Sequence, residues 1–142
     1  MNITQMKKWK LNYTRLSKIV GMDLNQFVEK HTYLKLASSG YMDLSVDVLG
    51  NNKIAIAHNY TQNGDLMCDP DMQILILPKL KMVQAYTYQQ DGLGIYQESL
   101  VFDDNGKPTG CRERLFNEHN SFLGTWLRNI ISQGHKPVEV EQ

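Results

Sequence analysis

The feature that most constrains the fold of this chain is a series of short segments in which apolar and polar residues alternate, with brief polar turns between them. Residues 41–49 place Met, Leu or Val at every second position and Asp or Ser between them, which is typical of a strand with one buried face. Residues 53–61 alternate again, and Asn63-Gly64 is a turn pair that joins hairpin strands. Parallel pairing needs crossovers of about a dozen residues or more, and these turns leave no room for them. The pattern therefore predicts an antiparallel meander.

The predicted sheet occupies residues 33–104 and has four to five strands. The expected strands are residues 41–49, 53–61, 71–77, 82–89 and 95–102.

Helices are expected on both sides of this sheet region in the sequence. Residues 1–32 form a helical N-terminal part, in which an apolar stripe at spacings of three and four precedes a stop at Gly21. A second short helix is expected over Leu24–His31, with Asp23 as its N-cap. The stripe of the first helix consists of Met6, Trp9, Tyr13, Leu16 and Val20.

The C-terminal helix, predicted over residues 109–134, has the widest apolar face in the chain. We expect Trp126 and Phe122 to anchor it on the sheet, Gly134 to end it, and residues 135–142 to form a frayed tail. The chain thus reads as a single α+β domain of 142 residues, with the helix packed on one face of the sheet.

Composition excludes several classes of protein. The formal net charge is zero, which argues against a globally basic nucleic-acid coat. The longest strongly apolar run, Ile74–Leu77, is far too short to span a membrane, and the N-terminal lysines precede no apolar signal segment. Cys68 and Cys111 stand apart and outside any zinc-binding spacing. We expect a cytoplasmic protein with two reduced thiols, no metal and no cofactor.

Charge is distributed unevenly along the chain. Residues 1–22 hold five basic and no acidic residues, whereas residues 43–104 hold nine acidic and three basic residues. The simpler interpretation is that the basic helix and the acidic sheet complement each other within the fold. The alternative is that the helix binds nucleic acid or an acidic partner. On a helix, Lys7, Lys10 and Lys18 fall close to one face and are the candidate nucleic-acid contacts.

Asp65, Asp69 and Asp71 surround the turn at residues 63–72. Carboxylates at close spacing are ligands for Ca²⁺ or Mg²⁺, and a small metal-dependent hydrolase using the Asp65–Asp91 region is one hypothesis. Asp also builds turns by accepting bonds from nearby backbone N–H groups, and we favour that role. The run lacks the spacing of an EF-hand loop, so no metal ligand is assigned.

Two histidines are candidate general bases. His58 is expected on a strand face with Tyr60, and His119 on the apolar face of the last helix. A general base needs an orienting acid, and a buried histidine with one hydrogen bond explains His119 better. No catalytic residue is assigned.

Tyrosines and acids gather around the turn at Asp91. Tyr86 and Tyr88 are expected to share one face, and Tyr96 joins Glu98 on the next strand. Tyrosines with an acidic rim suit a partner surface, although tyrosine also favours strands at sheet edges. These five residues are the candidate protein-binding site.

Three stretches of the chain are distinctive: Asp69-Pro70-Asp71-Met72, the run from Tyr88 to Glu98, and the helical run from Asn120 to Asn129 followed by Gln133-Gly134. Together they resemble a family of uncharacterised bacterial domains often met in phages, plasmids and conjugative elements. The resemblance covers about residues 55–135 and implies an accessory protein of a mobile element that binds a protein or nucleic acid.

The leading functional hypothesis is a non-enzymatic module that binds an unknown protein partner. Weak nucleic-acid binding through the first helix is the second hypothesis, and the hydrolase is the third.

Overall fold

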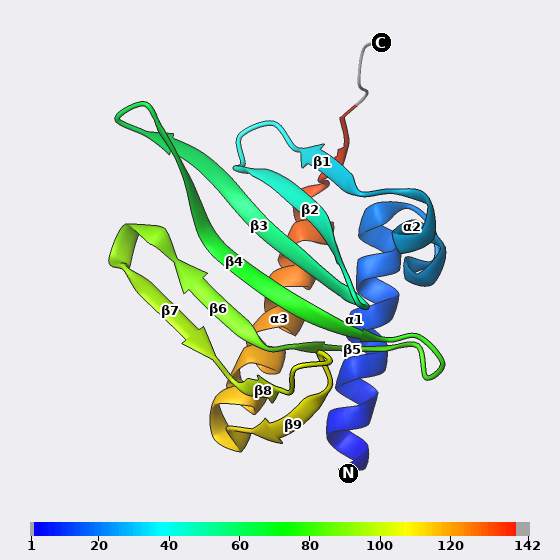
Figure 1. Cartoon of the computed structure of the whole chain (residues 1–142). Helices are drawn as coiled ribbons and strands as arrows, with labels where there is room; N and C mark the ends of the chain where they lie inside the picture. Colours follow the sequence, from blue (N-terminus) through cyan, green and yellow to red (C-terminus); the bar gives the residue numbers. More distant parts are fainter. Residues whose placement is uncertain (1, 139–142) are drawn as a thin grey trace.

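The computed structural model describes residues 2–138 as three α-helices and an extensively paired antiparallel sheet (Figure 1). The helices are α1 (Ile3–Val20), α2 (Leu24–Lys30) and α3 (Glu113–Gln133). The strands are β1 (Tyr33–Ala37), β2 (Asp43–Gly50), β3 (Lys53–Gln62), β4 (Asp65–Leu77), β5 (Met82–Ala85), β6 (Thr87–Gln90), β7 (Ile95–Glu98), β8 (Leu100–Phe102), β9 (Pro108–Cys111) and β10 (Lys136–Pro137). A single 3₁₀ turn, η1 (Asp91–Leu93), joins β6 to β7.

The main sheet runs in the order β10-β1-β2-β3-β4-β6-β7, and β5 pairs with the second half of β4. Every pairing is antiparallel. The strands β8 and β9 form a separate hairpin. The predicted α+β class and antiparallel sheet are confirmed, and the helices α1 and α3 lie behind the sheet in Figure 1.

The alternation in the sequence places one face of the sheet in the core. On that face the buried side chains come from every second position of β2, β3 and β4, and they pack against α1 and α3. Burial of this much apolar surface is the main force that holds the helices on the sheet. The sheet contributes Leu44, Val46, Ile54, Ile56, Met72, Ile74 and Ile76, and the helices contribute Leu16, Leu123, Trp126, Leu127 and Ile130.

The predicted helix ends are confirmed at their C-termini. Gly21 and Gly134 both adopt the left-handed conformation and donate their N–H groups to the preceding turn, as C-terminal glycines do. Trp126 is 5% exposed and belongs to the core, whereas Phe122 is 39% exposed and lies at its border. Of the two expected anchors, therefore, Trp126 is the buried one.

Asp23 occupies the N-cap position of α2, as predicted, but it does not cap the helix with its side chain. That side chain accepts a bond from the Tyr13 hydroxyl at 2.9 Å and lies 3.7 Å from the Lys81 ammonium. Ser17 takes over the capping role, because its hydroxyl accepts the bond from the Leu24 N–H.

The sheet is larger than the sequence suggested. β1 and β10 add an edge, β8 and β9 add a hairpin, and α3 begins at Glu113 rather than at residue 109 because residues 108–111 belong to β9. Of the expected tail, residues 136 and 137 pair with β1, and residues 139–142 lie outside the described part of the chain.

The second face of the sheet is covered only at one end. There Leu75 and Tyr86 pack with Leu100 and Phe102 of the β8–β9 hairpin and with Trp9 and Phe116 from the helices. The rest of this face, over β1 to β4, β6 and β7, has no helix on it (Figure 1). We call it the bare face. None of the helices in residues 2–138 is long and apolar enough to cross a membrane.

Candidate functional site

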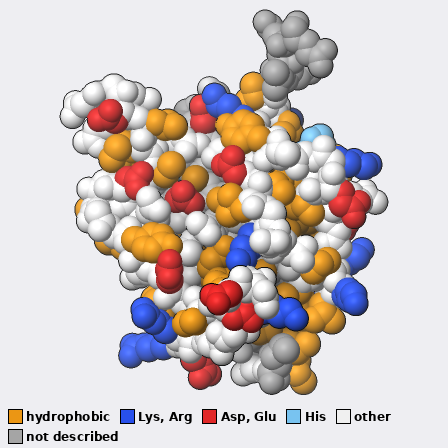
Figure 2. All heavy atoms as spheres, viewed as in Figure 1, with side chains coloured by type: hydrophobic (Ala, Val, Ile, Leu, Met, Phe, Trp, Pro, Cys, Tyr) orange, Lys and Arg blue, Asp and Glu red, His pale blue; other side chains and the backbone are white. Residues whose placement is uncertain are grey.

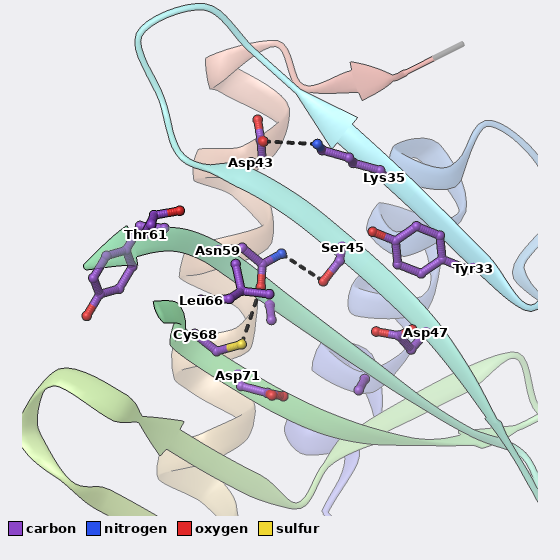
Figure 3. Close-up of a pocket in the computed structure, with 13 residues that line it drawn as sticks. Tyr33, Lys35, Asp43, Ser45, Asp47, Asn59, Thr61, Leu66, Cys68 and Asp71 are labelled. Atoms are coloured by element: carbon purple, nitrogen blue, oxygen red, sulfur yellow. Dashed lines mark hydrogen bonds and ion pairs between the residues drawn. The ribbon is translucent and has the colours of Figure 1, made fainter. Parts of the chain in front are cut away.

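The bare face carries a hollow of about 550 Å³ over β1 to β4. Its floor consists of small side chains: Ser45 on β2 lies opposite Ala57 on β3, and Ala55 lies two positions before Ala57. Asp47 lies opposite Ala55, and Asp71 lies opposite Ala57 on the other side of β3. The two carboxylates thus flank the small floor diagonally, as Figure 3 shows. We call this site the acidic hollow.

Neither carboxylate in the acidic hollow has a cationic or hydrogen-bonding partner among the described residues. Burial raises the pKa of Asp47. Burial also raises the pKa of Asp71, and the negative charges of Asp91 and Asp47 raise it further. Carboxylates that are partly desolvated and repel each other favour a cation nearby.

Polar contacts hold the far side of the hollow in place (Figure 3). The Asn59 amide donates to the Ser45 hydroxyl at 3.0 Å and accepts from the Cys68 thiol at 3.3 Å. The Lys35 ammonium lies 3.4 Å from the Asp43 carboxylate. Lys35 is therefore already paired at the rim and does not neutralise the two central carboxylates.

Cys68 is not an activated nucleophile. Burial raises the pKa of its thiol, and the nearby carboxylates of Asp71, Asp91 and Asp47 raise it further. A raised pKa keeps the thiol protonated at neutral pH, and the thiolate is the reactive form.

Asp91 braces the turn next to the hollow. Its carboxylate accepts bonds from the Gln89 amide at 2.6 Å and the Cys68 N–H at 2.8 Å, and these bonds lower its pKa. The next residue, Gly92, has little room for a side chain, because a Cβ there would come 3.0 Å from the Tyr60 hydroxyl. Asp91 therefore fixes the η1 turn against β4.

The structure disperses the five residues of the predicted tyrosine site. The chain breaks its strand at Tyr86, between β5 and β6, so Tyr86 and Tyr88 do not share a face as expected. Tyr86 is buried against Phe102, and Tyr88 packs against Phe122 of α3.

The other members of that site remain at the surface. Tyr96 is 53% exposed, and its hydroxyl donates to Glu98 at 2.6 Å. Tyr96 pairs with Gln89, which pairs with Asp71, so it extends the same row across the sheet as the acidic hollow. Only this part of the predicted site belongs to the bare face.

The three aspartates expected in one turn lie along a single strand. Asp65, Asp69 and Asp71 all belong to β4, and only Asn63-Gly64 forms the turn. Asp65 sits at the exposed hairpin tip, where it pairs with Gln62. The sequence pattern did not show this because β4 continues through a register shift, at which Asp69 and Pro70 of β4 lie opposite His58 alone.

No group of three or more His, Cys, Asp or Glu side chains within residues 2–138 is arranged to hold a metal ion. The cysteines are both free. The Asp65–Asp91 region therefore contains the acids that the hydrolase hypothesis named, but they do not converge on one point.

The histidines are buried among structural partners. His58 faces the core, where its ring lies 5.4 Å from that of Trp126 and 5.5 Å from that of His135. His119 is 3% exposed and lies 2.9 Å from the Ser99 hydroxyl and 3.1 Å from the Gln97 side-chain oxygen. It makes two polar contacts rather than the expected one. Burial lowers the pKa of His58 and of His119.

The predicted charge complementarity between the first helix and the sheet is wrong. Among the described residues there are three salt bridges, Lys35–Asp43, Lys81–Asp23 and Arg114–Glu118, and none involves a basic residue of α1. The core lies between α1 and the bare face, so their charges point away from each other. Acidic and apolar side chains gather over the bare face, while most Lys and Arg side chains lie toward the periphery (Figure 2).

The predicted nucleic-acid residues are at the surface. Lys7, Lys10 and Lys18 are all exposed on α1. Lys7 lies beside Lys8, Arg15 and Arg128 in a groove between α1 and α3, whereas Lys10 faces another side of the helix. Arg128 comes from the far end of the sequence, so no local pattern indicated that it joins the basic residues of α1.

The acidic hollow was not predicted as a site, although part of its signal is in the sequence. The polar face of residues 41–49 was evident, but the importance of Ala55 and Ala57 was not. Small residues at two alternate positions of a strand leave room above the sheet. Their value emerges only when the register sets them between Asp47 and Asp71.

These features define an α+β protein with helices on one face of an antiparallel sheet and an acidic hollow on the other. A family described as "Domain of unknown function (DUF6908)" matches residues 12–136, and the chain belongs to this family. The match extends further toward the N-terminus than the resemblance at residues 55–135. Neither the comparison with curated proteins nor that with solved structures gives a match.

Proposed function

We propose that the protein is a non-enzymatic binding module that holds a basic protein segment in the acidic hollow. The observation that supports this most is the pair of carboxylates, Asp47 and Asp71, which have no partner within residues 2–138 and lie on a sheet face with no helix over it. Charge complementarity selects partners by attracting the opposite charge and rejecting the same one.

The spacing of the two carboxylates favours a basic segment over a single ion. Asp47 and Asp71 are two strands apart and offset by two residues. With strands about 4.8 Å apart and a rise of about 3.4 Å per residue, their Cα atoms are roughly 12 Å apart. One metal ion needs ligands within about 2.6 Å of itself, so both carboxylates cannot reach it. Two basic side chains of one extended segment can each reach one carboxylate.

The surroundings of the hollow suit a peptide. The small floor leaves room for the stems of lysine or arginine side chains, which bury their methylene groups while the charged heads reach polar partners. Tyr33 and Leu66 at the rim are 52% and 72% exposed, and they offer apolar contacts. Exposed aromatic and apolar side chains beside charges are typical of partner surfaces.

Binding of a fluorescein-labelled peptide of alternating arginine and alanine tests the proposal. We expect fluorescence anisotropy at low salt to show binding that weakens as salt rises, because salt screens exposed charges. The same peptide with glutamate in place of arginine should not bind.

Two variants separate the hollow from general charge. Asp47→Asn with Asp71→Asn should weaken binding by at least about tenfold, because each charge-assisted contact contributes about 1.5–3 kcal/mol. Glu29→Gln with Asp104→Asn removes the same charge from exposed sites elsewhere and should bind like the wild type. Equal loss in both variants, or no binding by the wild type, would contradict the proposal.

An accessory role in a mobile genetic element is the wider context of this proposal. It is supported by the resemblance alone, and the genes that neighbour the coding sequence are the observation that tests it.

A further inference from the structure

A second charged site lies on the helix side of the molecule. α1 and α3 run parallel, and polar contacts join them: Gln5 to Asn117 at 2.6 Å and Lys8 to Ser121 at 2.7 Å. Above this seam is a groove of about 410 Å³. We call it the helix groove and define it by Lys7, Lys8, Arg15, Ser121, Gly124 and Arg128.

The helix groove is basic and has no counter-charge from residues 2–138. Four of its side chains are cationic, and none of its lining residues is acidic. Among the described residues, no salt bridge involves any of the four. Arg15 donates to the Asn12 side-chain oxygen at 3.0 Å, and Arg128 donates to the Thr125 hydroxyl at 3.4 Å. Their neutral partners orient the guanidinium groups without neutralising them.

The fold places two like charges close together at a cost. Partial burial lowers the pKa of Arg15, and the positive charge of Arg128 lowers it further. Gly124 makes the approach of the helices possible, since a Cβ there would lie 3.3 Å from the Asn12 oxygen and 3.4 Å from the Arg15 nitrogen. A local arrangement that opposes stability without an evident internal gain is typical of a functional site.

We propose that the helix groove binds phosphate groups of a nucleic-acid backbone. Guanidinium groups match phosphate oxygens in a two-pronged geometry. The Ser121 hydroxyl, which accepts from the Lys8 ammonium, adds a donor beside them. Lys7 and Arg15 are eight residues apart on α1, which is about 12 Å along the axis. Successive nucleotides of one strand rise about 3.4 Å, so the groove spans several phosphates.

A polyanion with dense, regular charge fits the groove better than an acidic protein segment. Leu11, which is 52% exposed, is the one large apolar side chain in the lining. Protein partners usually add large apolar or aromatic anchors to their charges, and Leu11 is the one such side chain that the groove offers them. Sequence-independent backbone contacts need only cations and hydroxyls.

The salt dependence of binding to a labelled DNA duplex measures the number of phosphate contacts. Each contact adds about −0.9 to the slope of log affinity against log salt concentration, so four contacts predict a slope between about −3 and −4. Arg15→Gln with Arg128→Gln should make the slope less steep by about 2. Lys79→Gln with Lys107→Gln removes two exposed positive charges elsewhere and should keep the wild-type slope.

Stability separates loss of the site from loss of the fold. Arg128→Gln relieves the repulsion on Arg15, so its melting temperature should equal or exceed that of the wild type while DNA affinity falls. Asp47→Asn with Asp71→Asn should leave DNA binding intact, which separates this inference from the proposed function. Labelled polyglutamate that binds more tightly than DNA would reassign the groove to an acidic protein. Undetectable DNA binding at low salt, or an unchanged slope in the double arginine variant, would overturn the proposal.

Discussion

The acidic hollow and the helix groove carry charges of opposite sign but share the same kind of residue arrangement. Each holds two like charges near one another without a counter-charge from the described residues. The hollow does so on a sheet, where register alone sets Asp47 and Asp71 on either side of a small floor. The groove does so between helices, where Gly124 lets Arg15 approach α3.

The comparison shows that a chain of zero net charge can keep its acidic and basic residues on separate sides of the fold. Like charges repel each other, and the repulsion is stronger where solvent is partly excluded. Pairing the basic helix with the acidic sheet would have removed both repulsions. Instead the shared core lies between them, so the two charged sites face separate surroundings.

The largest expected effect is on the free energy of unfolding, when a substitution weakens the core on which both sites depend. Trp126 belongs to the core cluster that joins α3 to the sheet and is 5% exposed. Trp126→Ala should lower the free energy of unfolding by about 3–5 kcal/mol, as deletion of large buried aromatics does. Urea unfolding measures this loss.

Asn129→Ala is the matched control on the same helix. Asn129 is exposed, so its replacement should change the free energy of unfolding by less than about 0.5 kcal/mol. A loss below about 1 kcal/mol for Trp126→Ala would show that the core does not join the two sides through this residue.

The sequence predicted the core better than the sites because cores follow periodicity. The stripe of α1 and the alternation of β2 and β3 are local patterns, and they placed Leu16, Ile54 and Ile56 correctly. The helix stops at Gly21 and Gly134 are equally local. Such patterns require only the neighbouring residues and the geometry of one element.

Both sites depend on pairings between distant elements. The hollow needs the register of β2, β3 and β4, and the groove needs Arg128 to meet Arg15 across more than a hundred residues. The strand break at Tyr86 is also a tertiary effect, since the Tyr86 carbonyl accepts the Ser99 N–H and the Gln73 carbonyl accepts the Tyr86 N–H. No local signal in residues 82–89 marks that break.

The pH dependence of stability should differ between the two sides of the sheet. On the core side, burial lowers the pKa values of His58 and His119. As the pH falls, these histidines bind protons in the unfolded chain before they do so in the folded chain. Stability is therefore full above about pH 6.5 and is lost as the pH falls from that value toward the folded pKa. On the bare face, the raised pKa values of Asp47 and Asp71 have the opposite sign. As the pH falls, these aspartates bind protons in the folded chain before they do so in the unfolded chain. Lowering the pH toward about 4 therefore increases stability.

Chemical unfolding between pH 4 and pH 8 checks both signs. His58→Gln should flatten the loss of stability below about pH 6.5. Asp47→Asn with Asp71→Asn should raise stability near pH 7 and remove the gain at lower pH. In the Asp47→Asn, Asp71→Asn variant, which lacks the opposing gain, a curve without any fall between pH 7 and pH 5 would contradict the lowered pKa values of the two histidines.

Divalent metals should have the smallest effect, and this absence would sharpen the contrast between a peptide site and an ion site. Asp47 and Asp71 are about 12 Å apart at their Cα atoms, and Asp65 is six residues and thus roughly 20 Å from Asp71 along β4. Calcium needs six or more oxygens around one point, and these carboxylates do not converge. Thermal melts with EDTA, with millimolar Ca²⁺ and with millimolar Mg²⁺ should therefore coincide within about 1 °C.

The arginine peptide provides the positive reference for the same melts. A ligand that binds only the native state stabilises it by RT ln(1 + [L]/Kd), so a concentration a hundred times Kd contributes about 2.7 kcal/mol. The peptide should raise the melting temperature of the wild type and of Glu29→Gln with Asp104→Asn, but not that of Asp47→Asn with Asp71→Asn. A rise of several degrees with metal that the same aspartate substitutions abolish would make the acidic hollow a cation site.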